Sequence, residues 1–135
     1  MPVTHPPAAD AIYGADLLSS GELDALPYGM IQLDARGRIL RYSHAETRLS
    51  GLTADECVGR HFFDEVAPCT HVQEFYGRFL EGVRQAQLDV VFNFRFMFVP
   101  PRDVRVHMFY SKVTRSVWVK VVDLGAADGR RDGAG

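Results

Sequence analysis

Cys69 is the residue of this chain whose type and position could support covalent chemistry. It follows Pro68 on an expected loop between helical segments, where a thiol is accessible. A lone cysteine in a small domain is usually buried and inert, and spacing alone favours that interpretation. Cys57 lies in an expected helix and is interpreted as packing. The two cysteines form neither a CxxC pair nor a zinc-ligand spacing, so both are expected to be free thiols.

Tyr42 and Glu46 are a phenol and a carboxyl group four residues apart. Their pattern alone gives each an ordinary structural role. Glu46 is the third residue after Ser43, where it would close a capping box at the protein surface. Tyr42 would be an aromatic residue at the end of a strand.

The segments that position these residues are expected to be a hairpin and short helices. Residues 29–33 and 38–42 are strand-like and flank the Gly-containing loop 34–37. Residues 43–46 and 53–56 both match the capping-box pattern, so a short helix should begin at each.

The second half of the chain predicts one longer helix and three strands. Apolar residues recur at helical spacing over residues 75–83. Residues 90–98 alternate, which places four Phe side chains on one sheet face. Two more strands follow at 104–112 and 117–122. This order predicts an α+β domain with a five-stranded antiparallel sheet and helices on one side.

The ends of the chain differ in composition from its middle. Residues 1–18 are rich in Pro, Ala and Asp and are expected to be loose, and one capped helical turn or two should follow before Pro27. The boundaries are therefore an N-terminal cap segment at 1–28, a core at 29–124 and a disordered tail at 125–135.

Several segments of the chain resemble the photoactive yellow protein family, whose fold is a PAS domain. The resemblance covers nearly all of residues 23–122. The Ala-Pro-Cys stretch together with Tyr42 and Glu46 is specific, because ordinary PAS domains lack this combination. The matching segments are Tyr28-Gly29-Met30-Ile31-Gln32-Leu33-Asp34, Val58-Gly59-Arg60-His61-Phe62-Phe63, Val66-Ala67-Pro68-Cys69-Thr70, Glu74-Phe75-Tyr76-Gly77, Val104-Arg105-Val106-His107-Met108 and Trp118-Val119-Lys120-Val121-Val122.

The resemblance implies a chromophore, 4-hydroxycinnamic acid, bound to Cys69 as a thioester. Tyr42 and Glu46 would then turn inward and donate hydrogen bonds to its phenolate. A phenol has a pKa of about 10 in water and burial raises it, so a buried phenolate needs such donors. Glu46 donates only when protonated, which an apolar pocket favours. Ser50 would add a hydroxyl behind Tyr42, although a solvated turn serine is an equally good interpretation.

The resemblance also implies which residues wall the pocket, and core packing explains most of them equally well. Leu52 stands where the family has an arginine that screens the chromophore, so it keeps the pocket dry but supplies no cation. The loop at 99–101 lacks the family's methionine. The expected wall residues are Ile31, Phe62, Val66, Ala67, Thr70 and Phe96.

The implied function is that of a blue-light photoreceptor, a switch and not an enzyme. Trans–cis isomerisation of the chromophore would draw a proton from Glu46 and strand a buried carboxylate. The domain would relieve that charge by partial unfolding, in which the segment 1–28 loosens first.

Composition limits the classes of binding partner and the cellular location that we expect for this protein. The formal net charge of −2 gives no indication of nucleic acid or an anionic membrane. No apolar run is long enough to span a bilayer, and the first residues lack the pattern of a signal peptide. We expect a cytoplasmic protein, a monomer or weak dimer, that acts on a signalling partner which the sequence does not name.

Three other functions compete with the photoreceptor. One is a PAS interaction module without chromophore. Another is a cysteine hydrolase with Cys69 as nucleophile and His71 as base, although no positioned partner for the base is evident. The third is a haem-binding PAS domain that uses His107, which lies in an expected strand and not on a helix.

Overall fold

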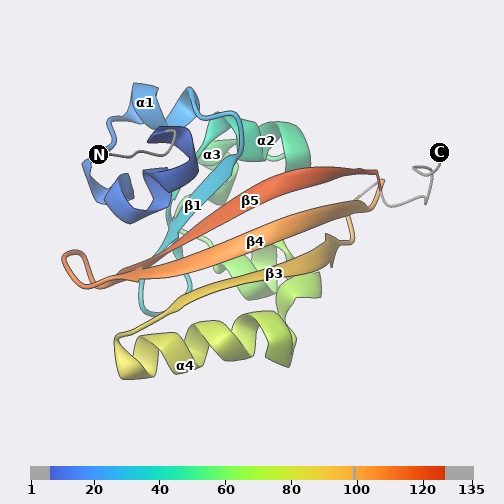
Figure 1. Cartoon of the computed structure of the whole chain (residues 1–135). Coiled ribbons are helices and arrows are strands. Elements are labelled where there is room, and N and C mark those ends of the chain that lie inside the picture. The colour runs from blue at the N-terminus through green and yellow to red at the C-terminus, as the bar shows by residue number, and fades with distance from the viewer. Residues whose placement is uncertain (1–6, 99, 127–135) are drawn as a thin grey trace.

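The computed structural model describes residues 7–98 and 100–126, which form one twisted sheet with helices on one face and the N-terminal segment over part of the other (Figure 1). The five strands lie in the order β2-β1-β5-β4-β3, and every neighbouring pair is antiparallel. This is the predicted sheet, including the hairpin of the first two strands. The strands are β1 (Gly29–Leu33), β2 (Ile39–Tyr42), β3 (Asp89–Phe96), β4 (Arg102–Ser111) and β5 (Ser116–Ala126).

Short helices connect the hairpin to β3 and pack on one face of the sheet. Two of them begin at the predicted caps, with Ser43 and Thr53 as N-cap residues. The predicted longer helix starts as a π-helical turn and continues as a regular α-helix. The elements are α2 (His44–Ser50), α3 (Ala54–Cys57), three irregular turns (Phe62–Val66, Pro68–Thr70 and Gln73–Gly77) and α4 (Arg78–Gln85).

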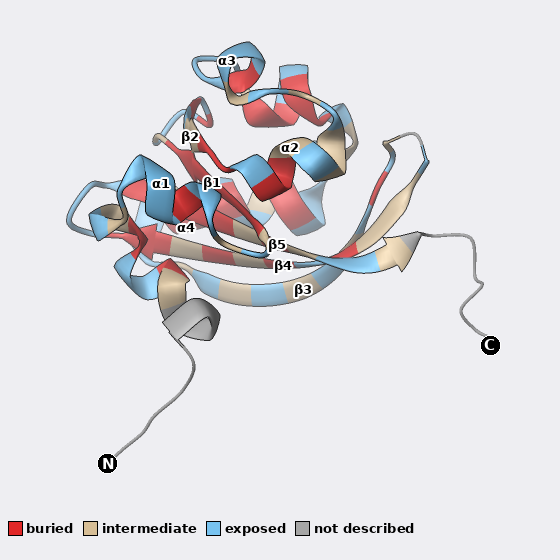
Figure 2. Cartoon of the chain, turned by 90° about the horizontal axis from the view of Figure 1, so that it is seen from above, coloured by how far each residue is buried: buried red, intermediate tan, exposed pale blue. Residues whose placement is uncertain are grey.

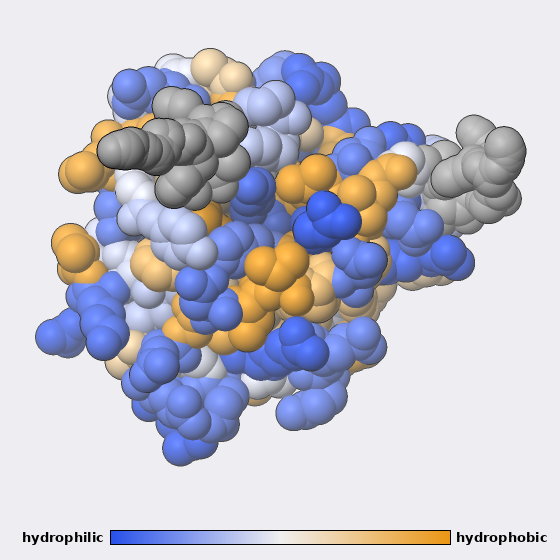
Figure 3. All heavy atoms as spheres, viewed as in Figure 1, coloured by the Kyte–Doolittle hydropathy of each residue, from blue (hydrophilic) through white to orange (hydrophobic). Residues whose placement is uncertain are grey.

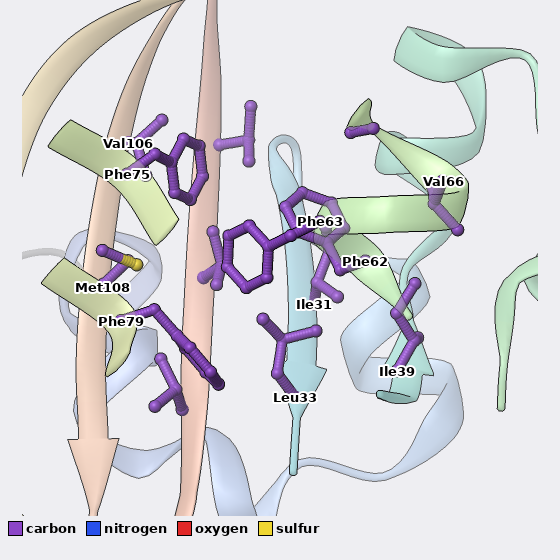
Figure 4. Close-up of a cluster of buried hydrophobic side chains, with 14 of the residues drawn as sticks. Ile31, Leu33, Ile39, Phe62, Phe63, Val66, Phe75, Phe79, Val106 and Met108 are labelled. Carbon is purple, nitrogen blue, oxygen red and sulfur yellow. The ribbon is translucent and has the colours of Figure 1, made fainter. Parts of the chain in front are cut away.

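The main hydrophobic core lies between these helices and the sheet. Phe96 is fully buried, Phe92 and Phe94 are half-buried, and the alternate residues Asn93 and Arg95 are exposed, as the alternation in β3 predicted. The Phe75 ring meets the Phe92 and Phe94 rings of this face edge-on, and Figure 4 shows many of the buried side chains. The labelled members are Ile31, Leu33, Ile39, Phe62, Phe63, Val66, Phe75, Phe79, Val106 and Met108.

The expectation of a loose N-terminal segment is wrong for residues 7–17. These residues form 3₁₀-helical turns (Pro7–Leu17), and α1 (Ser20–Asp24) follows; both lie near the same end of the sheet (Figures 1 and 2). We call residues 7–28 the N-terminal cap. This segment contains a short apolar stripe that its overall composition does not reveal. Ile12 and Ala15 are three residues apart in it, and both are buried.

A second hydrophobic cluster joins the N-terminal cap to the sheet. Ile12, Ala15 and Leu23 pack with Met30 and Trp118, which alternate with residues of the main core and so point to the opposite face. The cap covers only part of this face, and Figure 3 shows apolar patches between hydrophilic side chains over the rest.

The C-terminal boundary lies later than predicted. Gly125 and Ala126 belong to β5, because they pair with Asp103 and Arg102 of β4. Residues 127–135 of the expected tail lie outside the described residues. In the described part of the chain, no helix is long and apolar enough to cross a bilayer.

Candidate functional site

Glu46 does not close the capping box that its spacing suggests. The Ser43 hydroxyl accepts the Glu46 N–H at 3.4 Å, but the Ser43 N–H is bonded to the Met30 carbonyl oxygen of β1 at 3.0 Å. The Glu46 carboxyl is therefore not needed at the cap, and the side chain turns inward, where the residue is only 1% exposed. The matching pattern at Thr53 does close, with its N–H 2.8 Å from Glu56 Oε1.

The Glu46 carboxyl group is held neutral by burial. Its Oε1 atom is buried and has no hydrogen-bond partner in the described structure. Loss of solvation raises the pKa of this carboxyl from 4.5 to about 8. At neutral pH Glu46 is thus mostly protonated, and it can donate a hydrogen bond to an anionic acceptor.

Tyr42 is a second neutral donor beside Glu46. It ends β2 with its ring in the core, and its hydroxyl lies 2.7 Å from the Ser50 hydroxyl. Burial, and then the nearby Glu46 carboxyl, raise the pKa of Tyr42. The Ser50 oxygen also accepts the Leu52 N–H at 3.1 Å, which holds Ser50 behind Tyr42.

Cys69 is presented by a short, well-fixed turn. The 3₁₀ turn Pro68–Thr70 begins with proline, and the Thr70 hydroxyl donates to the Ala67 carbonyl oxygen at 2.6 Å. Cys69 is half-buried and its sulfur accepts the Met97 N–H at 3.5 Å. Cys57 is free as well but fully buried, in agreement with its interpretation as packing.

The expected wall residues gather in the main core. Thr70 is buried, and Leu52 and Cys69 are half-buried and pack against the same cluster. The turn that carries Cys69 therefore borders the cluster that contains Tyr42. The other buried wall residues are Ile31, Phe62, Val66, Ala67 and Phe96, and the first three are labelled in Figure 4.

Two features of this region were not found from the sequence. One is the Met97 main chain, which reaches Cys69 although the Met97 side chain is 61% exposed. The other is Gly29, whose missing side chain leaves room for the Glu46 carboxyl. Its only sequence signal is a glycine at the start of an apolar strand. Val99 of the methionine-free loop lies outside the described residues.

A surface cleft of about 410 Å³ is lined by residues of α2 and β5. Gly29, Ala45 and Val121 contribute to its lining, and Ser50 and Pro100 line it as well. Gly29 therefore borders both this cleft and the Glu46 carboxyl.

The histidines required by two rival functions are engaged elsewhere. His71 Nδ1 lies 2.8 Å from Asp64 Oδ1 in an exposed pair, whereas the Cys69 sulfur accepts the Met97 N–H. His107 Nε2 lies 2.6 Å from Asp89 Oδ1, on the sheet face opposite the main core.

Comparison with known proteins places the chain in a family. The family model described as PAS fold matches residues 20–121, so the chain is a PAS domain. A structure of the PAS domain of an HTR-like protein from Haloarcula marismortui, 17% identical, has the same fold with a TM-score of 0.63; it covers 82% of this chain and 96% of that chain.

Relatives with higher sequence identity define the family within the PAS domains more closely. Photoactive yellow protein of Halochromatium salexigens is 42% identical over 105 residues, which are 77% of this chain and 84% of the relative. That of Rhodothalassium salexigens is 39% identical with the same coverage. The photoactive yellow protein domain of the sensor histidine kinase Ppr from Rhodospirillum centenum is 43% identical with a TM-score of 0.76, covering 82% of this chain and 96% of that domain. The chain belongs to the photoactive yellow protein family.

Proposed function

We propose that this protein is a blue-light photoreceptor that carries 4-hydroxycinnamic acid as a thioester on Cys69. The observation that carries the proposal is the pair of buried, neutral donors Tyr42 and Glu46, with Glu46 Oε1 lacking a partner. A buried polar atom without a hydrogen bond costs free energy unless a ligand satisfies it. A phenolate is a suitable acceptor for both donors.

The residues of the chain fit the chromophore at both of its ends. The Cys69 sulfur would be acylated by an activated form of the acid, with loss of the thiol proton and departure of the activating group. At the other end, Tyr42 and Glu46 would donate short hydrogen bonds to the phenolate oxygen. When bound, the group supplies absorption of blue light and isomerisation of its double bond.

The consequence for the protein follows from the charge on Glu46. Once Glu46 gives up its proton, a carboxylate is left in a fully buried position. An unpaired charge in such a place costs several kcal/mol or more, which is comparable to the stability of a small domain. The fold relieves this cost by loosening, and the N-terminal cap is the part we expect to release. The released surface would act on a signalling partner in the cytoplasm.

Reconstitution with the activated acid tests this function. The full chain should become yellow, Cys69→Ala should stay colourless and folded, and Cys57→Ala should colour as the parent does. Light should then bleach the visible band reversibly. Equal chromophore uptake by the Cys69 variant would overturn the attachment site, and a parent that stays colourless would favour a PAS interaction module without chromophore.

A further inference from the structure

Position 29 has a space requirement that only glycine meets. Gly29 lies in β1 opposite Val121, and its φ is not positive, so its backbone alone would accept another residue. A Cβ atom at this position, however, would lie 2.0 Å from Glu46 Oε1 and 3.1 Å from Glu46 Cδ. Non-bonded carbon and oxygen atoms do not approach to the first of these distances. The Glu46 carboxyl thus occupies the volume that a side chain at position 29 would take.

We propose that Gly29 is a positioning residue for the Glu46 acid: the absent side chain creates the site between β1 and α2 in which the carboxyl is buried. The proposal rests on the proposed function for its role in the light response. The positioning itself is a property of the chain without chromophore. The Ser43 N–H donates to the Met30 carbonyl oxygen, which frees the Glu46 carboxyl to reach this site, and Gly29 makes room for it.

Alanine at position 29 should displace the carboxyl without unfolding the domain. The clashing atoms are the far end of a flexible side chain, so Glu46 can rotate away while β1 keeps its pairing. Gly29 and Ala45, the neighbour of Glu46, both line the surface cleft, so solvated free volume lies next to these residues. A carboxyl that moves toward water is ionised more easily.

The first measurement is a titration of the Glu46 carboxyl in the chromophore-free full chain, by carbon NMR of labelled glutamate. In Gly29→Ala the proton affinity of Glu46 should fall at least about tenfold, which is a drop of one pKa unit or more. Gly21→Ala is the control, because nothing lies within 4 Å of a Cβ at that position. An unchanged titration in Gly29→Ala would overturn the proposal.

The second measurement separates the contact with Glu46 from a general effect on the strand. In the Glu46→Ala background the clash is gone, so the destabilisation caused by Gly29→Ala should vanish or reverse sign. A cost that persists unchanged in that background would also overturn the proposal. If Gly29→Ala fails to fold, recovery of folding in the double variant supports the contact, and failure of both contradicts it.

These results do not depend on the chromophore. A parent protein that stays colourless on reconstitution would count against the proposed function and leave the titration and the double-variant comparison valid. A coloured parent with an unchanged Gly29→Ala titration would count only against the role of Gly29.

Discussion

Glu46 is the residue that should link the stability of the fold to pH. Its pKa is raised to about 8 in the folded protein and is near 4.5 in the unfolded chain. Between these values the folded state holds a proton that the unfolded state has lost. Stability must therefore fall as pH rises through this window, by at most about 1.4 kcal/mol per pH unit.

The effect can be isolated by comparing the chromophore-free parent with Glu46→Gln in urea unfolding between pH 5 and pH 8. The parent should lose stability across this range relative to Glu46→Gln, whose amide does not titrate. Parallel stability curves for the two proteins would show that the carboxyl is ionised in the fold. In the pigmented protein the same variant keeps a weaker donor, so its dark absorption should move to longer wavelength.

Leu52 should make the pigmented dark state sensitive to pH. It is half-buried against the core and supplies no charge near the proposed phenolate. Leu52→Arg should favour the ionised form, because a long side chain can keep its stem on the core and its cation near the pocket. Leu52→Gln is the uncharged control. The check is an absorption titration, and coincident curves for the parent and the arginine variant would contradict the idea.

Among the short helices, two identical patterns show where sequence reasoning reaches its limit. Residues 43–46 and 53–56 both predict a capping box, yet only Thr53 and Glu56 form one. The difference is the partner of the Ser43 N–H, a carbonyl of β1 that is distant in the sequence. Cap and strand positions follow local pattern and were predicted. The inward turn of Glu46 depends on a tertiary contact, so only the family resemblance anticipated it.

The loop between β3 and β4 should slow the return to the dark state. In the family its methionine is expected to contact the chromophore with a soft side chain, whereas here Pro100 lines the surface cleft. Pro100 and Pro101 each fix their φ angle and stiffen the loop. Pro100→Met should speed recovery after a flash more than Pro100→Ala, which removes only the stiffness. Equal recovery in all three proteins would place the role elsewhere.

At the scale of the whole molecule, the Asp16 carboxylate ties the N-terminal cap to the sheet, beside the hydrophobic cluster under the cap. Asp16 accepts hydrogen bonds from the Trp118 indole N–H at 2.8 Å, the Thr114 hydroxyl at 3.0 Å and the Ser111 hydroxyl. Burial would raise the pKa of Asp16, but these hydrogen bonds together lower it. The segment was expected to be loose because it is rich in Pro, Ala and Asp. Its docking depends on a short apolar stripe and on partners of Asp16 that lie far along the chain.

The Asp16 contacts predict how the cap detaches. The pKa of Asp16 is lower in the docked cap than in an undocked one. Its contribution to docking is therefore complete at a pH above the ordinary pKa of a carboxyl group, and it is lost as the pH falls through the lowered pKa. Asp16→Ala should weaken docking by about 1–3 kcal/mol at neutral pH. Amide hydrogen exchange should then rise over residues 11–17 and stay unchanged in β3. Asp55→Asn, on the exposed first turn of α3, is the control, and equal exchange in both variants would contradict the role of Asp16.

Trp118 gives the molecule a built-in optical probe of the cap. It is the only tryptophan of the chain, it is fully buried, and the Arg41 guanidinium lies 5.5 Å from the centre of its ring. It belongs to the cluster under the cap, on the sheet face opposite the main core. Its fluorescence emission therefore depends on cap docking, whereas visible absorbance would depend on the pocket. Recording both signals after one flash would time the arrival of the light signal at the far side of the sheet without any introduced label.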